Sequence, residues 1–252
     1  MTGLGGQVAL VTGSSRGIGA AIATLFAQHG ARVVIHGRNT DALADVQAKI
    51  AAAGGEVLIA AAELTDYDQV EAMRAQIEEH AGPVDILVAN AGGSAVRPAL
   101  VEDITEADWR SSIDTNLTAT FLTIKSFLPG MKHRGQGSII TMSSAAARRP
   151  NTGSPVAYAA AKAAIELLTK DVAVQAGPFG IRANCISPET IMTDRNQRQI
   201  PQATQLSLID SHPIRRLGTP EDVAHAALFL AAGTAAWITG IILDVAGGSV
   251  LV

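Results

Sequence analysis

Strand-length apolar runs alternate with helix-length segments along almost the whole chain, and this alternation constrains the fold more than any other feature. The runs are continuous stretches of Val, Ile, Leu and Ala, which is typical of strands covered on both faces. They occupy residues 7–12, 31–36, 56–61, 85–90, 138–143, 181–187 and 240–245. Helix-length segments cover residues 17–29, 40–53, 66–80, 105–134, 155–176 and 219–232. We therefore expect an α/β fold with one seven-stranded, mostly parallel sheet, doubly wound by helices on both faces.

The alternation also indicates how the chain is divided. No linker rich in Pro, Gly or Ser interrupts it, so residues 1–252 are expected to form a single domain. Residues 189–215 are the exception, because they form a connection far longer than usual. Long connections of this kind often carry function. We predict that residues 189–215 form a lid over a substrate-binding site.

Composition excludes several kinds of protein. The 252 residues are 48% hydrophobic and 17% charged, as in a compact folded domain rather than a disordered chain. A net charge of −4 without a basic block argues against a nucleic-acid partner. A single cysteine permits no internal disulfide, and no apolar stretch approaches the ~20 residues of a membrane helix. Because residues 1–13 also lack a signal-peptide pattern, we expect a cytoplasmic protein without membrane contact.

A glycine-rich loop, TGSSRGIG at residues 12–19, joins the first predicted strand to the first predicted helix. Its glycines would let a pyrophosphate approach the helix N-terminus, where free N–H groups and the helix dipole favour an anion. Glycines can also simply separate a strand from a helix, so the strand–loop–helix context is what indicates a dinucleotide-binding Rossmann fold. The loop residues expected at the cofactor are Gly13, Ser15, Arg16, Gly17, Ile18 and Gly19.

The second predicted strand ends in Gly37 and Arg38, where dinucleotide-binding folds usually place an acid against the ribose 2′-hydroxyl. A carboxylate would repel a 2′-phosphate, whereas a guanidinium holds phosphate through two hydrogen bonds. Arg16 is expected to reach the same phosphate from the glycine loop. A solvated arginine near a helix start is the alternative. The missing acid and the two arginines together predict NADP(H) rather than NAD(H).

Tyr158 and Lys162, in the sequence YAAAK, lie one turn apart on the same face of a predicted helix. A tyrosine with its ordinary pKa of ~10 is a poor acid–base catalyst near neutral pH. A neighbouring ammonium favours the phenolate and lowers that pKa toward a useful range. An accidental pair is the alternative. Since the chain has only two tyrosines, we favour a catalytic pair.

Polar residues at two further places fit the same site. Ser143 and Ser144 end a predicted central strand, at the edge of the sheet where ligands bind in such folds. A hydroxyl there can stabilise the charge that develops on a substrate carbonyl oxygen, although a polar strand end is the simpler explanation. Asn116 lies in the middle of an apolar helical segment and must find hydrogen-bond partners if it is buried.

In this arrangement the chain resembles the short-chain dehydrogenase/reductase family over essentially its whole length. The matching positions are Thr12, Gly13, Gly17, Gly19, Asn90, Ala91, Gly92, Asn116, Ser143, Ser144, Tyr158, Lys162, Pro188, Thr193 and residues 244–248. The resemblance implies that Tyr158 is the general acid in ketone reduction and the general base in alcohol oxidation. Lys162 would lower the pKa of Tyr158 and hold the nicotinamide ribose, and Ser144 would position the carbonyl. Asn116 would anchor a water in a proton relay from Lys162.

The resemblance also implies contacts with the cofactor outside the glycine loop. These contacts would come from the ends of later strands and the loops that follow them. The residues are Glu63, Leu64, Asn90, Ala91, Gly92, Pro188, Ile191 and Thr193, together with Tyr158 and Lys162.

Among the positions that depart from the family pattern, three bear on ligands or partners. Glu63 replaces an aspartate that contacts adenine. Glu189 replaces a glycine after Pro188; we expect its side chain to point away and pair with an arginine such as Arg195, the alternative being a carboxylate near the substrate. Phe179 replaces a basic residue with which related reductases hold an acyl-carrier protein, and this weakens the case for a carrier-protein partner.

We therefore expect an NADPH-dependent reductase of a 3-oxoacyl compound or another ketone with an apolar flank, given the apolar residues in 200–209. The alternatives are a sugar or polyol dehydrogenase, with Arg148 and Arg149 as substrate contacts, and a non-catalytic NADP(H)-sensing regulator. The regulator predicts the loss of a catalytic residue, yet none is missing. No metal is expected. The family resemblance further implies a homotetramer or homodimer, built on the two longest helices and the apolar end at 249–252.

Overall fold

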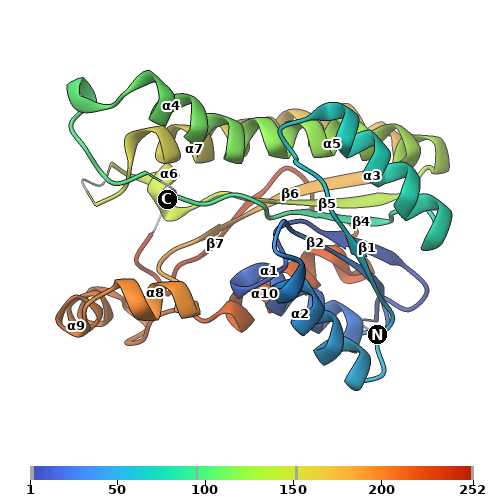
Figure 1. Ribbon diagram of the computed structural model, residues 1–252, viewed down its shortest axis with the longest axis horizontal. Helices are drawn as coiled ribbons and strands as arrows, with labels where there is room; N and C mark the ends of the chain where they lie inside the picture. Colours follow the sequence, from blue (N-terminus) through green and yellow to red (C-terminus); the bar gives the residue numbers. More distant parts are fainter. Residues whose placement is uncertain (1–2, 95, 151–152, 251–252) are drawn as a thin grey trace.

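Seven strands form one parallel sheet in the order β3-β2-β1-β4-β5-β6-β7 (Figure 1). The computed structural model describes residues 3–94, 96–150 and 153–250. The strands are β1 (Val8–Val11), β2 (Arg32–His36), β3 (Val57–Ala60), β4 (Ile86–Ala89), β5 (Gly137–Met142), β6 (Ile181–Pro188) and β7 (Ile242–Val245). Each overlaps a predicted apolar run. The doubly wound Rossmann fold is confirmed, with a sheet that is wholly rather than mostly parallel.

Helices cover both faces of the sheet (Figure 1). One layer consists of α1 (Gly17–Gln28), α2 (Thr40–Ala52) and α10 (Pro220–Ala231). The opposite layer consists of α3 (Tyr67–His80), α4 (Glu106–Ile113), α5 (Ala119–Arg134) and α7 (Val156–Ala176). Each layer encloses its own apolar core against the sheet, and residues such as Phe26 in the first and Met131 in the second are fully buried. These two cores hold the sheet and fix the position of its carboxyl edge.

The long helix predicted for residues 105–134 is interrupted. Helices α4 and α5 are joined by a π-helical turn, Asp114–Thr118, and this turn contains the buried Asn116. Single π turns inside helices frequently lie at functional sites. Short 3-10 turns are formed by Val101–Asp103, Gly177–Phe179 and Gly233–Ala235.

The predicted lid at 189–215 contains two helices, α8 (Asp194–Gln199) and α9 (Gln202–Ser211). They lie together at one end of the molecule, next to the segments that leave β6 and β7 (Figure 1). A further short helix, α6 (Ala145–Arg148), follows β5 directly. The carboxyl ends of the central strands and these lid helices frame the candidate site.

Two sequence expectations concern the outside of the molecule. The apolar chain end includes residues 251–252, which lie outside the described residues. Within the described ranges, no helix combines the length and the hydrophobicity that crossing a bilayer requires.

Candidate active site

The glycine loop leaves the first turn of α1 open to an anion. Helix α1 begins at Gly17, and the side chain of its N-cap residue Arg16 makes no capping hydrogen bond. Gly13 has a φ of 64°, and a Cβ on Gly19 would lie 2.5 Å from the carbonyl oxygen of Gly13. A larger residue would therefore be strained or would clash at these positions. The free N–H groups and the closely packed backbone fit the pyrophosphate of a dinucleotide.

Thr12 and Asn90 tie together the ends of β1 and β4, where the strand order reverses. Thr12 Oγ1 accepts hydrogen bonds from the backbone N–H groups of Asn90 and Ala91, both at 3.0 Å. Asn90 Nδ2 in turn donates to the carbonyl oxygens of Thr12 (2.9 Å) and Gly13 (3.1 Å). Ligands of doubly wound sheets bind at this reversal. These bonds explain why a threonine and an asparagine occupy the two motifs.

His36 supports the glycine loop from below, a role that sequence reasoning missed. The backbone N–H of Gly13 donates to His36 Nδ1 (3.3 Å), so Nδ1 carries no proton and Nε2 donates to the carbonyl oxygen of Ala62 (3.1 Å). The ring is 3% exposed, and burial lowers its pKa. His36 is therefore held as the neutral tautomer. Its place in an apolar strand run concealed it, although it immediately precedes Gly37 and Arg38.

A cavity of about 590 Å³ beside the end of β2 collects the predicted adenosine contacts. Arg16 and Arg38 both line it, as does Glu63, whose Oε2 lies 3.4 Å from Arg38 Nη1. The Arg38 side chain is 79% exposed, so its guanidinium can turn toward a ligand. The predicted cofactor residues that line this cavity are Gly13, Ser15, Arg16, Arg38, Glu63, Leu64, Ala91 and Gly92.

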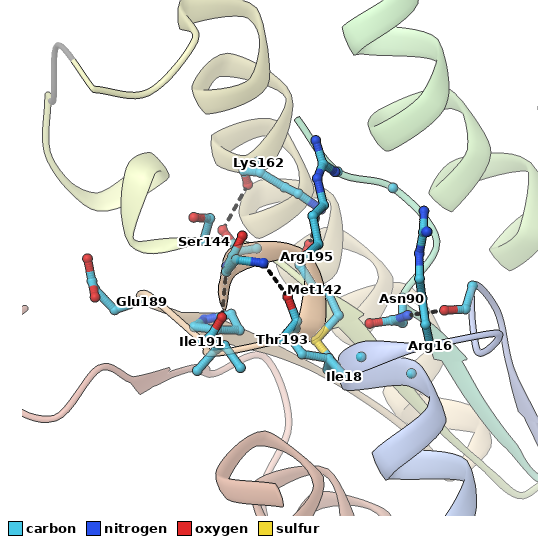
Figure 2. Close-up of a pocket in the computed structure, with 18 of the residues that line it drawn as sticks. Arg16, Ile18, Asn90, Met142, Ser144, Lys162, Glu189, Ile191, Thr193 and Arg195 are labelled. Carbon is cyan, nitrogen blue, oxygen red and sulfur yellow. Dashed lines mark hydrogen bonds between the residues drawn. The ribbon is translucent and has the colours of Figure 1, made fainter. Parts of the chain in front are cut away.

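A second cavity, of about 340 Å³, adjoins the first and is lined by Ser144, Tyr158 and Lys162 of the predicted catalytic residues. Figure 2 shows Ser144 and Lys162 in this cavity. The two cavities share the lining residues Gly13, Arg16, Gly92, Gly93 and Arg195. The predicted residues that line this catalytic cavity are Gly13, Arg16, Gly17, Ile18, Gly19, Asn90, Gly92, Ser144, Tyr158, Lys162, Pro188, Ile191 and Thr193. A dinucleotide lying along both cavities would bring its nicotinamide end to Tyr158.

The structure separates the roles of the two serines. Ser144 is the N-cap of α6, where its Oγ accepts a hydrogen bond from the N–H of Ala146 (3.2 Å), and its side chain hydrogen-bonds that of Tyr158. Ser143 is buried, and its Oγ lies 2.8 Å from Glu166 Oε1. Ser144 is thus the serine placed next to the phenol, while Ser143 fixes the strand end to α7.

The ammonium group of Lys162 lies near the ring of Tyr158 and is hydrogen-bonded to the end of β5. Its Nζ donates to the carbonyl oxygen of Met142 (2.8 Å) and lies 5.6 Å from the centroid of the Tyr158 ring. Burial lowers the pKa of Lys162 to about 8. Burial also raises the pKa of Tyr158, and the hydrogen bond from Ser144 opposes that rise. The expectation that Lys162 lowers the tyrosine pKa stays a prediction; in this structure the ammonium is directed at the carbonyl oxygen of Met142.

Asn116 lies behind the site and lines neither cavity. Its Nδ2 donates to the carbonyl oxygens of Ser112 (2.9 Å) and Gly93 (3.1 Å), and its Oδ1 accepts from the N–H of Gly93 (2.9 Å). A Cβ on Gly92 would lie 2.6 Å from Oδ1, so only glycine allows this close approach. The amide holds the loop after β4, which matches the role of a satisfied buried polar group. The proton relay from Lys162, through a water anchored by Asn116, stays a prediction.

Glu189 does not pair with Arg195 as expected. Its Oε2 lies 2.9 Å from His212 Nε2 and also accepts a hydrogen bond from the N–H of Thr190. Arg195 instead donates from Nη2 to the carbonyl oxygen of Ser94 (2.9 Å) and so crosses between the lid and the loop after β4. Sequence spacing could not reveal either contact, because each joins residues that only the fold brings together.

The predicted substrate contacts also change. Arg148 is committed to Glu166 (3.0 Å) and Asp244 (3.3 Å), so it cannot be the free contact expected for a polar substrate, whereas Arg149 is exposed. No residue of 200–209 lines the catalytic cavity within the part of the chain that is described. The lid residues that line it are Glu189, Ile191, Thr193, Asp194, Arg195, Asn196 and Arg198.

Comparison with known proteins agrees with this geometry. A family sequence model described as "Enoyl-(Acyl carrier protein) reductase" matches residues 13–249. The 7alpha-hydroxysteroid dehydrogenase of Escherichia coli (strain K12) is 37% identical over 247 residues, which cover 98% of this chain and 95% of that protein. The 3-oxoacyl-(acyl-carrier-protein) reductase of Chlamydia muridarum (strain MoPn / Nigg) is 37% identical over 243 residues, or 96% of each chain.

Solved structures are similar over the same extent. A 7alpha-hydroxysteroid dehydrogenase complexed with NADH and 7-oxo glycochenodeoxycholic acid has a TM-score of 0.93 at 37% identity, over 98% of this chain and 95% of that one. A gluconate 5-dehydrogenase from Burkholderia cenocepacia J2315, in complex with NADP and tartrate, has a TM-score of 0.92 at 31% identity, over 98% and 96%. Because sequence pattern and fold both match over nearly the whole chain, the protein belongs to the short-chain dehydrogenase/reductase family of oxidoreductases.

Proposed function

We propose that the protein reduces a ketone to a secondary alcohol with NADPH. The observation that carries the proposal is the hydrogen-bonded pair of Ser144 and Tyr158 in a cavity that adjoins the glycine loop. The bound cofactor supplies the hydride. A carbonyl placed in this cavity would meet hydroxyl donors on one side and the nicotinamide position on the other.

The chain's own groups carry the proton and the charge. The Ser144 hydroxyl donates a hydrogen bond to the carbonyl oxygen and stabilises the charge that develops there. The phenol of Tyr158 then gives its proton to that oxygen. Burial raises the pKa of Tyr158, so the phenol holds its proton near neutral pH until the carbonyl oxygen gains charge. Lys162 holds the strand end through the carbonyl of Met142 and presents a positive charge below about pH 8.

The preference for NADPH is supported by the charges around the adenosine cavity. Arg16 and Arg38 approach the same cavity from two different loops, and Arg38 is exposed enough to rotate. Glu63 is partly engaged with its own loop, where its Oε1 accepts from Thr65 Oγ1 (3.2 Å). A 2′-phosphate would therefore replace Glu63 as the partner of Arg38. Related structures hold NADH in one case and NADP in another, so the preference for NADPH is argued from the two arginines.

The substrate is a 3-oxoacyl compound or another ketone with an apolar flank. Met142 and Ile191 supply apolar surface in the catalytic cavity. A sugar or polyol dehydrogenase is the second candidate, because Glu189, Arg195 and Arg198 line the same cavity. A related enzyme complexed with tartrate supports this candidate, while a steroid dehydrogenase and a 3-oxoacyl reductase support the first.

The test follows consumption of NADPH and NADH separately with a panel of 3-oxoacyl thioesters, aryl ketones, keto esters and keto sugars. We expect turnover with NADPH and an apolar-flanked ketone to exceed that with NADH by about tenfold or more, since bonds to a charged phosphate are strong. Equal rates with both cofactors would remove the role given to Arg38. Turnover of keto sugars alone would select the second candidate.

We further propose that the protein forms a homotetramer or a homodimer. Large apolar side chains are exposed on the two longest helices and near the β7 edge of the sheet. They are Phe121 on α5, Leu167 and Val174 on α7, Phe229 on α10, and Trp237 before β7. Exposed apolar patches of this kind often mark subunit contacts. Sedimentation equilibrium measures the assembly directly, and a monomer at micromolar concentration would contradict the proposal.

A further inference from the structure

The lid is joined to the sheet through the ring of His212, at the end of α9. The ring is 3% exposed. Its Nδ1 lies 2.5 Å from the carbonyl oxygen of Leu208, and its Nε2 lies 2.9 Å from Glu189 Oε2. Glu189 directly follows β6 and lines the catalytic cavity. Figure 2 shows it across that cavity from Arg16 and Asn90.

The two atoms closest to the ring nitrogens of His212 are hydrogen-bond acceptors, and the nearby Ser211 Oγ, 3.5 Å from Nδ1, donates to the carbonyl oxygen of Leu208 (2.7 Å). A carbonyl oxygen and a carboxylate oxygen cannot donate, and a neutral imidazole carries only one N–H. Both contacts are satisfied together only when the ring has a proton on each nitrogen. The geometry therefore describes an imidazolium–carboxylate pair with Glu189, largely shielded from solvent.

Neighbouring charges are engaged elsewhere. Several of the charged groups around the pair, on the lid, α10, β7 and the catalytic cavity, have partners of their own. Arg216 binds Asp222 (2.6 Å), Arg215 binds the carbonyl of Asp210, Asp244 binds Arg148 (3.3 Å), and Arg195 binds the carbonyl of Ser94 (2.9 Å). Tyr158 hydrogen-bonds Ser144, and Lys162 binds the carbonyl of Met142 (2.8 Å). Glu189 and His212 are thus each other's charge partners.

The rest of α9 contributes little to holding the lid. None of its ten residues, Gln202–Ser211, is buried. Beyond the helix, the backbone N–H of Ile214 donates to the carbonyl of Gly247 (3.0 Å), and a Cβ on Gly247 would lie 3.2 Å from His212 Cδ2. The C-terminal loop therefore holds the corner after His212, while α9 itself depends on the His212 side chain.

We propose that Glu189 and His212 are positioning residues for the substrate: their ion pair holds α9 against the end of β6 and fixes the side chain of Glu189 in the lining of the catalytic cavity. Glu189 takes the place of a small residue in the family pattern, and the pair makes use of that replacement. Loss of either partner frees α9 from the end of β6, so substrate binding weakens while the cofactor groove stays intact.

Hydrogen exchange of the lid amides tests the pair without any need for activity. We would compare the amides of residues 202–212 in the wild type, Glu189→Gln, His212→Gln and the double variant at pH 6, with rates corrected for intrinsic exchange. Each single variant should exchange about tenfold faster at pH 6, as expected for loss of a charge-assisted bond, and the double variant should be no faster than the singles. His225→Gln is the matched control, because that histidine is exposed on α10.

Glu189→Gln keeps the size of the side chain and serves if His212→Gln does not fold. Equal lid exchange in Glu189→Gln and the wild type at pH 6 would overturn the proposal, as would additive effects in the double variant. In the activity assay, which rests on the proposed function, the variants should raise the KM for the ketone several-fold and leave the KM for NADPH nearly unchanged. Faster amide exchange of the lid in the variants, together with no turnover of any ketone by the wild type, would support the ion pair and reject the proposed reaction.

Discussion

The cofactor side and the lid side of the two adjoining cavities are built differently. On the cofactor side, the ends of β1, β2 and β4 are joined by partly buried bonds in which backbone groups take part, such as those of Thr12, Asn90 and His36. On the lid side, α9 has no buried residue, and the lid is held by side-chain contacts of Arg195 and His212 and by backbone bonds near its ends, such as that from Ile214 to Gly247. A fold can therefore keep one cofactor site while individual lid residues change the substrate.

The junction between these two sides is Tyr158, and changing it should have the largest effect. We expect Tyr158→Phe to lower kcat by about a thousandfold, because the proton donor is lost while the ring that packs beside Lys162 remains. Binding of NADPH should be nearly unchanged. Steady-state kinetics and a fluorescence titration with NADPH measure the two quantities.

Tyr67→Phe is the control for this change. Tyr67 is the other tyrosine of the chain and lies on α3, where it contacts Lys125. Its loss should leave kcat within about twofold, as for surface substitutions in general. Activity of Tyr158→Phe close to that of the wild type would refute the assignment of Tyr158 as the acid.

A change of Arg38 on the cofactor side should weaken the binding of NADPH much more than that of NADH. Arg38→Asp should weaken NADPH by about 10- to 100-fold, since a charge-assisted pair is replaced by a repulsive one, and should affect NADH much less. Calorimetric titration of the variant with both cofactors gives the comparison. Arg110→Asp, at an exposed i,i+4 pair on α4, is the control. Similar losses for NADPH and NADH would mean that Arg38 does not contact the phosphate.

The same contrast explains which features the sequence could predict. Apolar runs buried on both faces of a sheet leave a clear pattern, so all seven strands and the glycine loop were predictable. Tyr158, Lys162 and Ser144 were found because helix spacing and strand ends are local properties. The π turn at Asn116 was not predictable, since its hydrogen bonds depend on Gly93.

The lid contacts were missed for a physical reason as well. Glu189 was expected to find an arginine, yet it pairs with a histidine 23 residues away, across the α8 and α9 helices. The pKa of Tyr158 could not be foreseen either, because it depends on burial and on where Lys162 points. Position along the chain indicates which groups are available, but partners and solvent exposure come only with the packed fold.

A change at the lid should affect the cofactor less than Arg38→Asp does. Arg195 lines both cavities and donates to the carbonyl of Ser94, so Arg195→Ala opens the lid above the cofactor groove. We expect the KM for NADPH to rise by about three- to tenfold, in line with loss of one hydrogen bond to a charged group. Arg198→Ala is the matched control: Arg198 is also on α8, but its Nε donates to the carbonyl of Asp194 within the same helix. An equal effect of both changes would show that charge in the lid matters rather than the contact with Ser94.

The smallest effect should come from protonation of His36. Because burial lowers its pKa, the ring stays neutral in the folded protein below the range where an unfolded histidine, with a pKa of ~6.5, takes up a proton. The unfolded state then binds more protons, so this contribution to stability is present above pH ~6.5 and is lost as the pH falls through the lower pKa of the folded state. The affinity for NADPH should fall over the same range by roughly two- to threefold, since an imidazolium cannot accept the N–H of Gly13.

His36→Asn separates this effect from general acid sensitivity. An asparagine offers an uncharged acceptor to Gly13, so the variant should show a flatter dependence of the free energy of unfolding on pH between 5 and 7.5. Urea unfolding and NADPH titrations at both pH values provide the measurement, with His225→Asn as an exposed control. If His36→Asn loses stability and NADPH affinity toward acid as steeply as the wild type, the cofactor side does not depend on the protonation of this ring. The difference between the cofactor side and the lid side would then depend only on how the lid is attached.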